Sequence, residues 1–177
     1  MHVSSLRTLV LDGSLGFNIV AIVEERSDLL VCVAEDYRYD QPLLQRITNL
    51  IPSQAARAAL TGVVVGNGPG SYSGARVAAS AAIGIAAALA LPLRESPSDQ
   101  ALWQATQRPF SIGLGTREAL EVSEKGSVIV SRDGASPHLT QEESRGVAAC
   151  ALVREAGPVA SHVTLRYPAP ARGSEAR

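Results

Sequence analysis

The chain lacks an excess of basic residues. Its 16 lysines and arginines are balanced by 17 aspartates and glutamates, so the formal net charge is -1 and the isoelectric point is near 6.3. Proteins that hold nucleic acid by neutralising phosphates usually carry a clear basic excess. If RNA is involved in the function, we expect a partner protein to supply most of the contact with it.

Cysteine and long apolar segments are also scarce. Cys32 and Cys150 lie far apart in apolar surroundings, which favours two free buried thiols in a reducing compartment. Residues 1–6 do not form a charged region followed by an apolar stretch, so no secretion signal is expected. The longest apolar run, residues 77–91, is shorter than the ~20 residues of a membrane-spanning helix and contains Ser80 and Gly84. These features predict a soluble cytoplasmic protein with no membrane partner.

The length allows one ordinary domain or two small lobes. The 177 residues are 46% hydrophobic, which is enough to bury a core. We expect an N-terminal lobe over residues 1–97, a shortened C-terminal lobe over residues 98–167, and a disordered tail over residues 168–177 that is rich in Pro, Ala, Gly and Arg. The sequence contains no internal repeat.

The first hundred residues predict an α/β fold. Strands are expected at residues 8–11, 18–23 and 29–34, with a polar turn at 24–28, and short turns of this kind favour an antiparallel meander. A helix over residues 42–51, opened by Pro42, and a short helix over 54–60, capped by Ser53, follow. The β-branched run at residues 62–66 predicts a parallel strand buried on both faces. A helix over residues 74–91, a strand at 92–96 and a helix from residue 98 complete the pattern. This order is typical of a ribonuclease-H-like mixed sheet, the half-unit of actin-like ATPases.

The remaining residues predict a smaller lobe. Short strands are expected at residues 110–115, 119–123 and 127–131, with Lys125-Gly126 as a hairpin turn. Thr140 to Glu143 form a capping-box pattern for a helix that ends near residue 156, before Gly157-Pro158.

A glycine-rich segment joins the predicted buried strand to the following helix. It reads Gly68-Pro69-Gly70-Ser71-Tyr72-Ser73-Gly74-Ala75-Arg76. Two interpretations stay open from the residues alone: a tight turn with Ser73 as helix cap, or a phosphate-binding loop at a helix N-terminus. A Walker A loop is excluded because no Gly-Lys-Ser/Thr follows, and the spacing does not fit a Rossmann fingerprint.

This segment resembles the signature of the TsaB (YeaZ) family, in which a similar glycine-rich loop joins a buried strand to a helix of small residues. Leu11-Asp12-Gly13-Ser14 is similar to the family's Leu/Ile-Asp-Thr-Ser turn, with Gly13 in place of threonine. Leu43 and Ile47 match its apolar first helix, and Leu165-Arg166 weakly resembles its Tyr-Leu-Arg tail. The resemblance is good over residues 7–96. In the C-terminal part, Gly115-Thr116-Arg117 stands where the family has Asp-Ala-Arg.

The resemblance implies a non-catalytic scaffold in the synthesis of threonylcarbamoyladenosine in tRNA. The family pairs with TsaD, the paralogue that transfers the threonylcarbamoyl group to the adenosine beside the anticodon, and with the small ATPase TsaE. It implies no cofactor of the chain's own, with ATP or ADP and metal on the partners, tRNA contact only through the complex, and homodimers in isolation. Asp12, Gly13 and Ser14 would be a degenerate nucleotide site, and the signature loop would include Gly68, Pro69, Gly70, Ser71, Gly74 and Arg76.

The residues also argue against catalysis. The catalytic paralogues hold a metal with two histidines four residues apart on a helix, whereas His2, His138 and His162 are widely separated and Tyr39-Asp40 stands where related sequences have His-Ser. We therefore predict no metal site and no catalytic residue. Asp12 is either a magnesium-facing carboxylate or a turn residue that caps backbone amides.

An active enzyme of the actin-like superfamily, a small-molecule kinase or a peptidase-like hydrolase, is the alternative. The space after residue 98 is small for the second lobe of a kinase. A Ser-His-Asp triad from Ser71 or Ser73 with His138 or His162 lacks the Gly-x-Ser-x-Gly elbow.

The alanine-rich helix predicted over residues 74–91 is apolar on every side. One face must pack on the sheet, and the other requires cover from the helix at residues 42–51 or from a partner. We expect a partner interface that contains residues from both helices: Leu43, Leu44, Ile47, Ala79, Ile83 and Ala86.

Overall fold

A computed structural model describes residues 6–36, 38, 40–138 and 146–168. Its main sheet has the strand order β3-β2-β1-β4-β5, in which β2 is antiparallel to β1 and β3, and β4 is parallel to β1 and β5. The strands are β1 (Arg7–Asp12), β2 (Ile19–Arg26), β3 (Leu29–Glu35), β4 (Gly62–Gly66) and β5 (Leu93–Ser96). This topology confirms the predicted ribonuclease-H-like, actin-like α/β fold.

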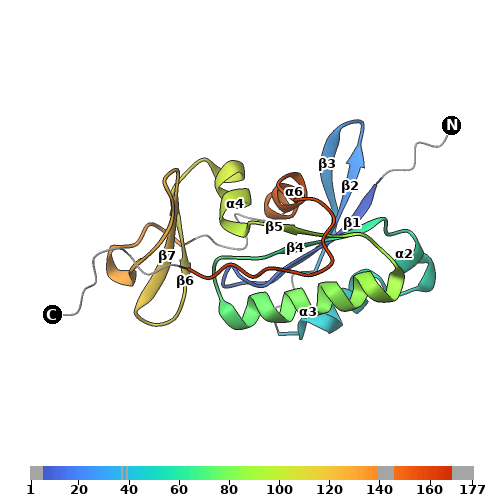
Figure 1. Ribbon diagram of the computed structural model, residues 1–177, viewed down its shortest axis with the longest axis horizontal. Helices are drawn as coiled ribbons and strands as arrows, with labels where there is room; N and C mark the ends of the chain where they lie inside the picture. Colours follow the sequence, from blue (N-terminus) through green and yellow to red (C-terminus); the bar gives the residue numbers. More distant parts are fainter. Residues whose placement is uncertain (1–5, 37, 39, 139–145, 169–177) are drawn as a thin grey trace.

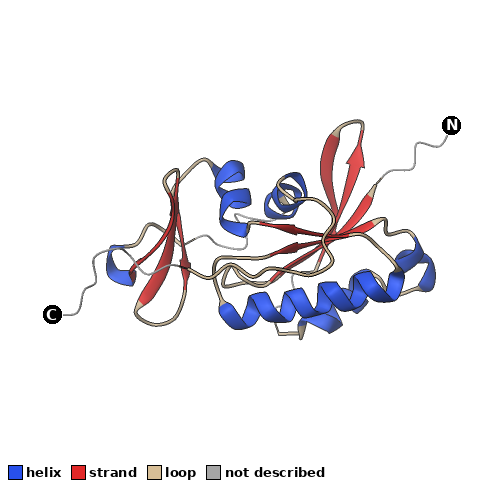
Figure 2. Cartoon of the chain, in the orientation of Figure 1, coloured by secondary structure: helices blue, strands red, loops and turns tan. Residues whose placement is uncertain are grey.

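Helices cover both faces of this sheet (Figure 1 and Figure 2). On one face lie α1 (Leu43–Leu50) and α3 (Tyr72–Leu89), with the short α2 (Gln54–Ala58) between them in the chain. On the other face lie α4 (Ser98–Thr106) and α6 (Val147–Arg154). The Ser53 hydroxyl caps α2, as predicted, by accepting a hydrogen bond from Ala56 N.

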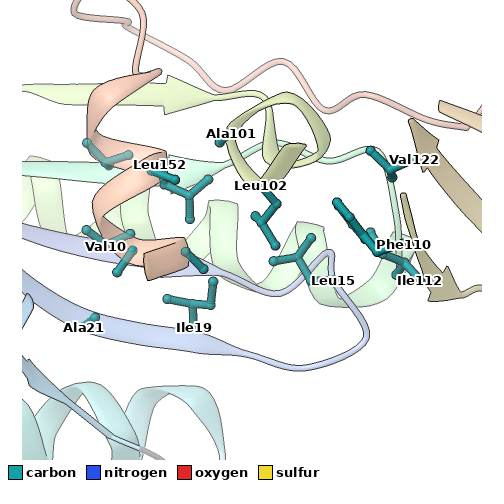
Figure 3. Close-up of a cluster of buried hydrophobic side chains, with 14 of the residues drawn as sticks. Val10, Leu15, Ile19, Ala21, Ala101, Leu102, Phe110, Ile112, Val122 and Leu152 are labelled. Atoms are coloured by element: carbon teal, nitrogen blue, oxygen red, sulfur yellow. The ribbon is translucent and has the colours of Figure 1, made fainter. Parts of the chain in front are cut away.

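Alternation along the strands builds the two halves of the core. On β1, Leu9 and Leu11 point into the cluster under α1 and α3, and Val10 points into the cluster under α4 and α6. Figure 3 shows Val10 in the second cluster, with Leu102 of α4 and Leu152 of α6 nearby. The run Val63-Val64-Val65 is buried on both faces, which is why β-branched residues fill β4 without interruption.

A second sheet of three antiparallel strands packs against α4. It contains β6 (Phe110–Gly113), β7 (Glu118–Ser123) and β8 (Gly126–Ser131), and a 3-10 turn (Arg132–Gly134) follows it. Phe110 and Val122 of this sheet join the same buried cluster as Val10 (Figure 3). The lobe boundary predicted at residues 97/98 falls between β5 and α4, and this one cluster contains side chains from both sides of it.

The helix α3 is long and apolar enough to cross a membrane by length and composition. In the structure it packs along β4 and β1 through Ala78 and Ala82, which are fully buried. It therefore serves as a core helix of the α/β domain.

Several predicted boundaries shift. The strand β2 runs on through Arg26, so the hairpin turn shrinks to Ser27-Asp28, both with positive φ, as a two-residue turn between twisted strands requires. The helix α3 begins at Tyr72, two residues before the predicted start.

Some predictions fall outside the described residues. They concern the capping box at residues 140–143, Tyr39, His2 and residues 169–177 of the tail.

Candidate functional site

The turn after β1 is built around a fully buried carboxyl group. Asp12 Oδ1 accepts a hydrogen bond of 2.7 Å from Ser14 N, and the hydroxyl groups of Ser14 and Ser98 face the carboxyl group. Burial raises the pKa of Asp12 above its ordinary value of 3.8, against the lowering effect of the Ser14 N hydrogen bond and the nearby hydroxyl groups. Among the described residues, Asp12 Oδ2 and Ser14 Oγ have no hydrogen-bond partner. The residue thus has the local role of an aspartate that caps its own turn, and its carboxyl group is shielded from solvent.

The signature loop closes directly over this turn. Ser71 N donates a hydrogen bond of 2.6 Å to the Ser14 carbonyl oxygen. Gly13 and Gly74 touch backbone to backbone: a Cβ atom on either would collide with the carbonyl oxygen of the other. Any side chain at position 13 would therefore push the start of α3 away from the turn.

Ser71, and not Ser73, caps α3. Its hydroxyl oxygen accepts a hydrogen bond from Gly74 N at 3.4 Å, and the helix begins at the next residue. The cap lies two residues earlier than the tight-turn interpretation placed it, and phosphate binding by the loop stays a prediction.

The C-terminal segment crosses the other side of the signature loop. Arg166 N donates to the Asn67 carbonyl oxygen at 2.8 Å, and Asn67 Nδ2 donates to the Thr164 carbonyl oxygen at 3.1 Å. Arg166 Nη1 lies 2.5 Å from Asp99 Oδ1 on α4 and donates to the Gly68 carbonyl oxygen at 3.2 Å. The weak tail resemblance at Leu165-Arg166 therefore marks a residue that ties together the loop, α4 and the C-terminal segment.

The predicted interface residues separate into two groups. Leu43, Ile47 and Ala86 are buried against the sheet of their own chain, and Ala79 is also buried. Leu44 and Ile83 are 64% and 41% exposed, and Val77, which the sequence did not single out, is 55% exposed. The alanine-rich composition of α3 could not show which of its faces is open.

An apolar groove of about 510 Å³ runs between α1 and α3 beside these exposed residues. Its lining is Leu44, Arg76, Val77, Ser80, Ala81, Gly84 and Ile85. Ser80, Ala81 and Gly84 have small side chains, which let the backbone of another helix approach α3 closely. No carboxylate lines the groove.

The side of α1 that faces away from the groove is anchored by a buried arginine. Arg46 is 1% exposed, donates to the Asn18 carbonyl oxygen at 3.0 Å and to the Asp36 carbonyl oxygen, and pairs with the Asp36 carboxylate at 3.7 Å. Hydrogen bonds from Arg38 chiefly hold the pKa of Asp36 at about 2. Sequence reasoning missed this anchor because a charged residue in an amphipathic helix pattern is ordinarily assigned to the solvent face.

The histidine and cysteine side chains of the described residues do not gather at one site. His138 Nδ1 lies 2.8 Å from Ser111 Oγ, whose hydroxyl also donates to the Ser136 carbonyl oxygen, and His162 Nδ1 lies 3.3 Å from Ser161 Oγ. Among the described residues, no three His, Cys, Asp or Glu side chains gather as a metal site. Cys32 and Cys150 are free thiols, as predicted, but both are half-buried rather than buried. Partial burial raises the pKa of Cys32 to about 11.

A protein-family model described as "TsaD: tRNA N6-adenosine threonylcarbamoyltransferase" matches residues 5–110, more than half of the chain. A search of curated proteins finds no significant match.

Three solved structures resemble the chain at low identity. YeaZ from Pseudomonas aeruginosa is 17% identical over 71% of this chain and 65% of its own, with a TM-score of 0.46. An uncharacterized protein with similarity to peptidase YeaZ from Pseudomonas aeruginosa is 16% identical over 76% and 71%, with a TM-score of 0.48. T. thermophilus RuvC in complex with a Holliday junction substrate is 8% identical over 87% and 99%, with a TM-score of 0.44. The chain spans just under two thirds of the first of these proteins, and TM-scores below 0.5 carry no functional argument.

Proposed function

Because the chain belongs to the TsaD family of tRNA N6-adenosine threonylcarbamoyltransferases, we propose that it acts in this tRNA modification as a non-catalytic, TsaB-type partner of a TsaD-like enzyme. The family match agrees with the resemblance recognised in residues 7–96.

The closed turn after β1 carries the non-catalytic part of the proposal. Phosphoryl transfer requires backbone amides and a carboxylate that face the phosphates and their metal. Here Ser14 N is bonded to Asp12, the Ser14 carbonyl oxygen accepts from Ser71 N, and Gly13 is in contact with Gly74. Opening the turn for a phosphate would separate α3 from β1, at the expense of buried core contacts.

The groove between α1 and α3 supports the partner part of the proposal. Leu44 and Val77 expose apolar side chains on its two sides, and an apolar surface of this kind gains free energy when another helix pair covers it. A TsaD-like protein is the proposed occupant in the complex, and a second copy of this chain occupies the groove in isolation.

The rest of the complex is proposed from the resemblance of residues 7–96 to the TsaB family. A TsaE-like ATPase joins the pair, ATP or ADP and metal are held by the partners, and tRNA is bound in the assembled complex rather than tightly by this chain alone. The proposed location is the cytoplasm.

Reconstitution tests the proposal. This chain is mixed with a TsaD-like enzyme, a TsaE-like ATPase, tRNA and the threonylcarbamoyl donor, and modified adenosine is measured. Omitting the chain should abolish product, and the Asp12→Asn variant should retain it because the carboxylate does no chemistry. Full product without the chain, or tight ATP binding by the chain alone in calorimetry, would contradict the scaffold role.

A matched pair of substitutions tests the groove. Val77→Glu places a charge in the groove, whereas Val128→Glu places the same charge on β8, where the valine is similarly exposed at 48%. We expect Val77→Glu to weaken association by tenfold or more while the protein stays folded, because an unpaired charge is costly to bury. Val128→Glu should associate normally in size-exclusion chromatography. Equal association of both variants would mean that another surface binds the partner.

A further inference from the structure

Two exposed tyrosines stack beside the signature loop. The rings of Tyr72, the first residue of α3, and Tyr167, in the C-terminal segment, have centroids 5.2 Å apart and an interplanar angle of 32°. Each residue remains 54% exposed. A pair of rings whose role was only to pack the C-terminal segment onto α3 would bury most of its apolar area. The exposed ring area of both tyrosines therefore indicates a surface that binds another molecule.

A cation completes this surface. The guanidinium carbon of Arg76 lies 5.0 Å from the centroid of the Tyr72 ring, and Arg76 Nη1 donates a hydrogen bond of 2.7 Å to the Tyr72 hydroxyl. In the part of the chain that the structure describes, Arg76 forms no ion pair. Its charge is therefore held in place by a neutral aromatic ring and stays available to an anion.

The position of Tyr167 is fixed by its neighbour. Arg166 is bonded through its backbone to Asn67 and through its side chain to Asp99 and Gly68. Asp99 is 3% exposed and also accepts a hydrogen bond of 2.5 Å from the Ser127 hydroxyl. These contacts place the second ring against the first before any ligand arrives, which lowers the entropic cost of binding.

The tyrosine surface borders a hollow of about 620 Å³ between the signature loop and the end of β6. Its lining contains Tyr72, the hydroxyl residues Ser71 and Ser73, and otherwise glycine, leucine and proline: Gly16, Gly70, Gly113, Leu114, Gly115 and Pro168. No carboxylate lines the hollow, so an anionic ligand meets no acidic side chain among its walls.

We propose that Tyr72, Tyr167 and Arg76 form a stacking surface for an unpaired base of RNA. Aromatic rings hold bases by stacking, and an adjacent arginine attracts the phosphate backbone, which is how proteins bind single-stranded RNA despite little sequence readout. A double helix does not fit this surface because its bases are already stacked inside. The inference rests on the proposed function: the RNA is the tRNA substrate of the complex, and this chain adds one local contact to the grip of its partner.

Fluorescence anisotropy with a labelled short single-stranded RNA tests the surface on the full-length chain alone. Tyr72→Ala and Tyr167→Ala should each weaken binding about 5- to 150-fold, the effect of losing one stacked base. Arg76→Gln should weaken binding and reduce its salt dependence by about one unit of slope. Tyr72→Phe keeps the ring and should retain most of the affinity, and Val128→Ala, an exposed residue on β8, should bind like the unaltered chain. Thermal melts establish that each variant is folded.

In the assembled complex, Tyr72→Ala and Tyr167→Ala separate this inference from the proposed function, whereas Arg76→Gln is measured on the chain alone because Arg76 also lines the groove proposed for the partner. Assembly with the TsaD-like enzyme should be unchanged, while the KM for tRNA rises with both alanine variants. If no complex forms, the proposed function fails and the measurement on the chain alone still decides the stacking surface.

Several results would overturn the inference. They are tRNA and RNA affinities unaffected by either alanine variant, a loss with Tyr72→Phe as large as with Tyr72→Ala, and binding of free ATP in preference to RNA. Absence of RNA binding by both the chain and the complex would overturn it as well.

Discussion

At the scale of single residues, burial changes what a familiar motif can do. Asp12 occupies the end of the first strand, where an actin-like ATPase places a carboxylate near magnesium and phosphates. Here it is fully buried with its turn closed by α3, and desolvation favours its neutral form.

The first prediction concerns the pH dependence that Asp12 imposes. Because its pKa in the folded protein is raised above 3.8, its contribution to stability is full below that value and is lost as the pH rises through the raised pKa. Asp12→Asn is neutral at every pH and can keep the bond from Ser14 N. We expect a higher melting temperature than the unaltered chain at neutral pH and a difference that shrinks toward pH 3.8.

Thermal melts across this range provide the measurement, with Asp12→Ala as the control. The alanine variant leaves Ser14 N without its acceptor and should be less stable throughout. If Asp12→Asn lowered the melting temperature equally at neutral pH and at pH 3.8, the raised pKa of Asp12 would be contradicted.

The second prediction compares two glycines of α3. A Cβ at Gly74 meets the Gly13 carbonyl oxygen, whereas a Cβ at Gly84 meets nothing within 4 Å. Gly74→Ala should therefore lower the free energy of unfolding by about 1–3 kcal/mol through overpacking, and Gly84→Ala should raise it by about 0.5–1 kcal/mol through helix propensity. Urea denaturation measures both. If both alanine variants raised the free energy of unfolding, the close contact between Gly74 and Gly13 would be contradicted.

At the scale of elements, the position of α1 depends on one buried ion pair. Arg46 joins α1 to Asn18 in the turn before β2 and to Asp36 after β3. The exposed Leu44 on the same helix lines the proposed partner groove. Because Arg46 holds α1 against the sheet, Leu44 on the same helix faces the groove in a defined orientation.

The third prediction concerns acid sensitivity of this anchor. The pKa of Asp36 is lowered to about 2 from 3.8, so its contribution is present above 3.8 and is lost as the pH falls through about 2. Asp36→Asn should destabilise the protein at neutral pH, and the difference from the unaltered chain should narrow as the pH falls into this window. Acid titrations followed by circular dichroism test it. A constant difference down to the acid limit would assign the anchoring to the hydrogen bonds of Arg46 with the Asn18 and Asp36 carbonyl oxygens alone.

At the scale of the whole molecule, the C-terminal segment connects parts that are distant in sequence. Val159 pairs with Arg94 at the edge strand β5, and Arg166 reaches the signature loop and α4. Through Asp99 the same network reaches Ser127 of the second sheet. The division into two lobes at residues 97/98 stays a prediction, with this network and one shared core running across it.

The fourth prediction is that Arg166→Ala loosens the whole network. Among the described residues, removing the guanidinium leaves the nearly buried Asp99 with the Ser127 hydroxyl as its one side-chain partner. A hydrogen bond to a charged group contributes about 1.5–3 kcal/mol. We expect a loss of this size in unfolding free energy and faster amide exchange over residues 164–167. Arg57→Ala, which removes an exposed arginine with one backbone contact, should change neither. Equal exchange in both variants would show that backbone bonds alone hold the segment.

Local patterns in the sequence were enough to determine the order of elements, the parallel position of residues 62–66 and the place of the signature loop. Each depends on neighbours within one strand or one turn: β-branched runs, helical spacing, and glycine next to a buried strand. The family relationship followed from the same segment, because its glycines and serines have to stand at fixed spacing to join that strand to α3.

Only the tertiary structure decided which long-range contacts surround the site. The contact of Gly13 with Gly74 could not be predicted, because a glycine in sequence does not reveal which backbone approaches it. The open face of α3 was hidden because alanine is nearly the same on every side of a helix. Arg46 inside the core and Arg166 on the signature loop make contacts 10 to 98 residues away along the chain. Such contacts depend on where the strands bring the chain together, and no local pattern records that.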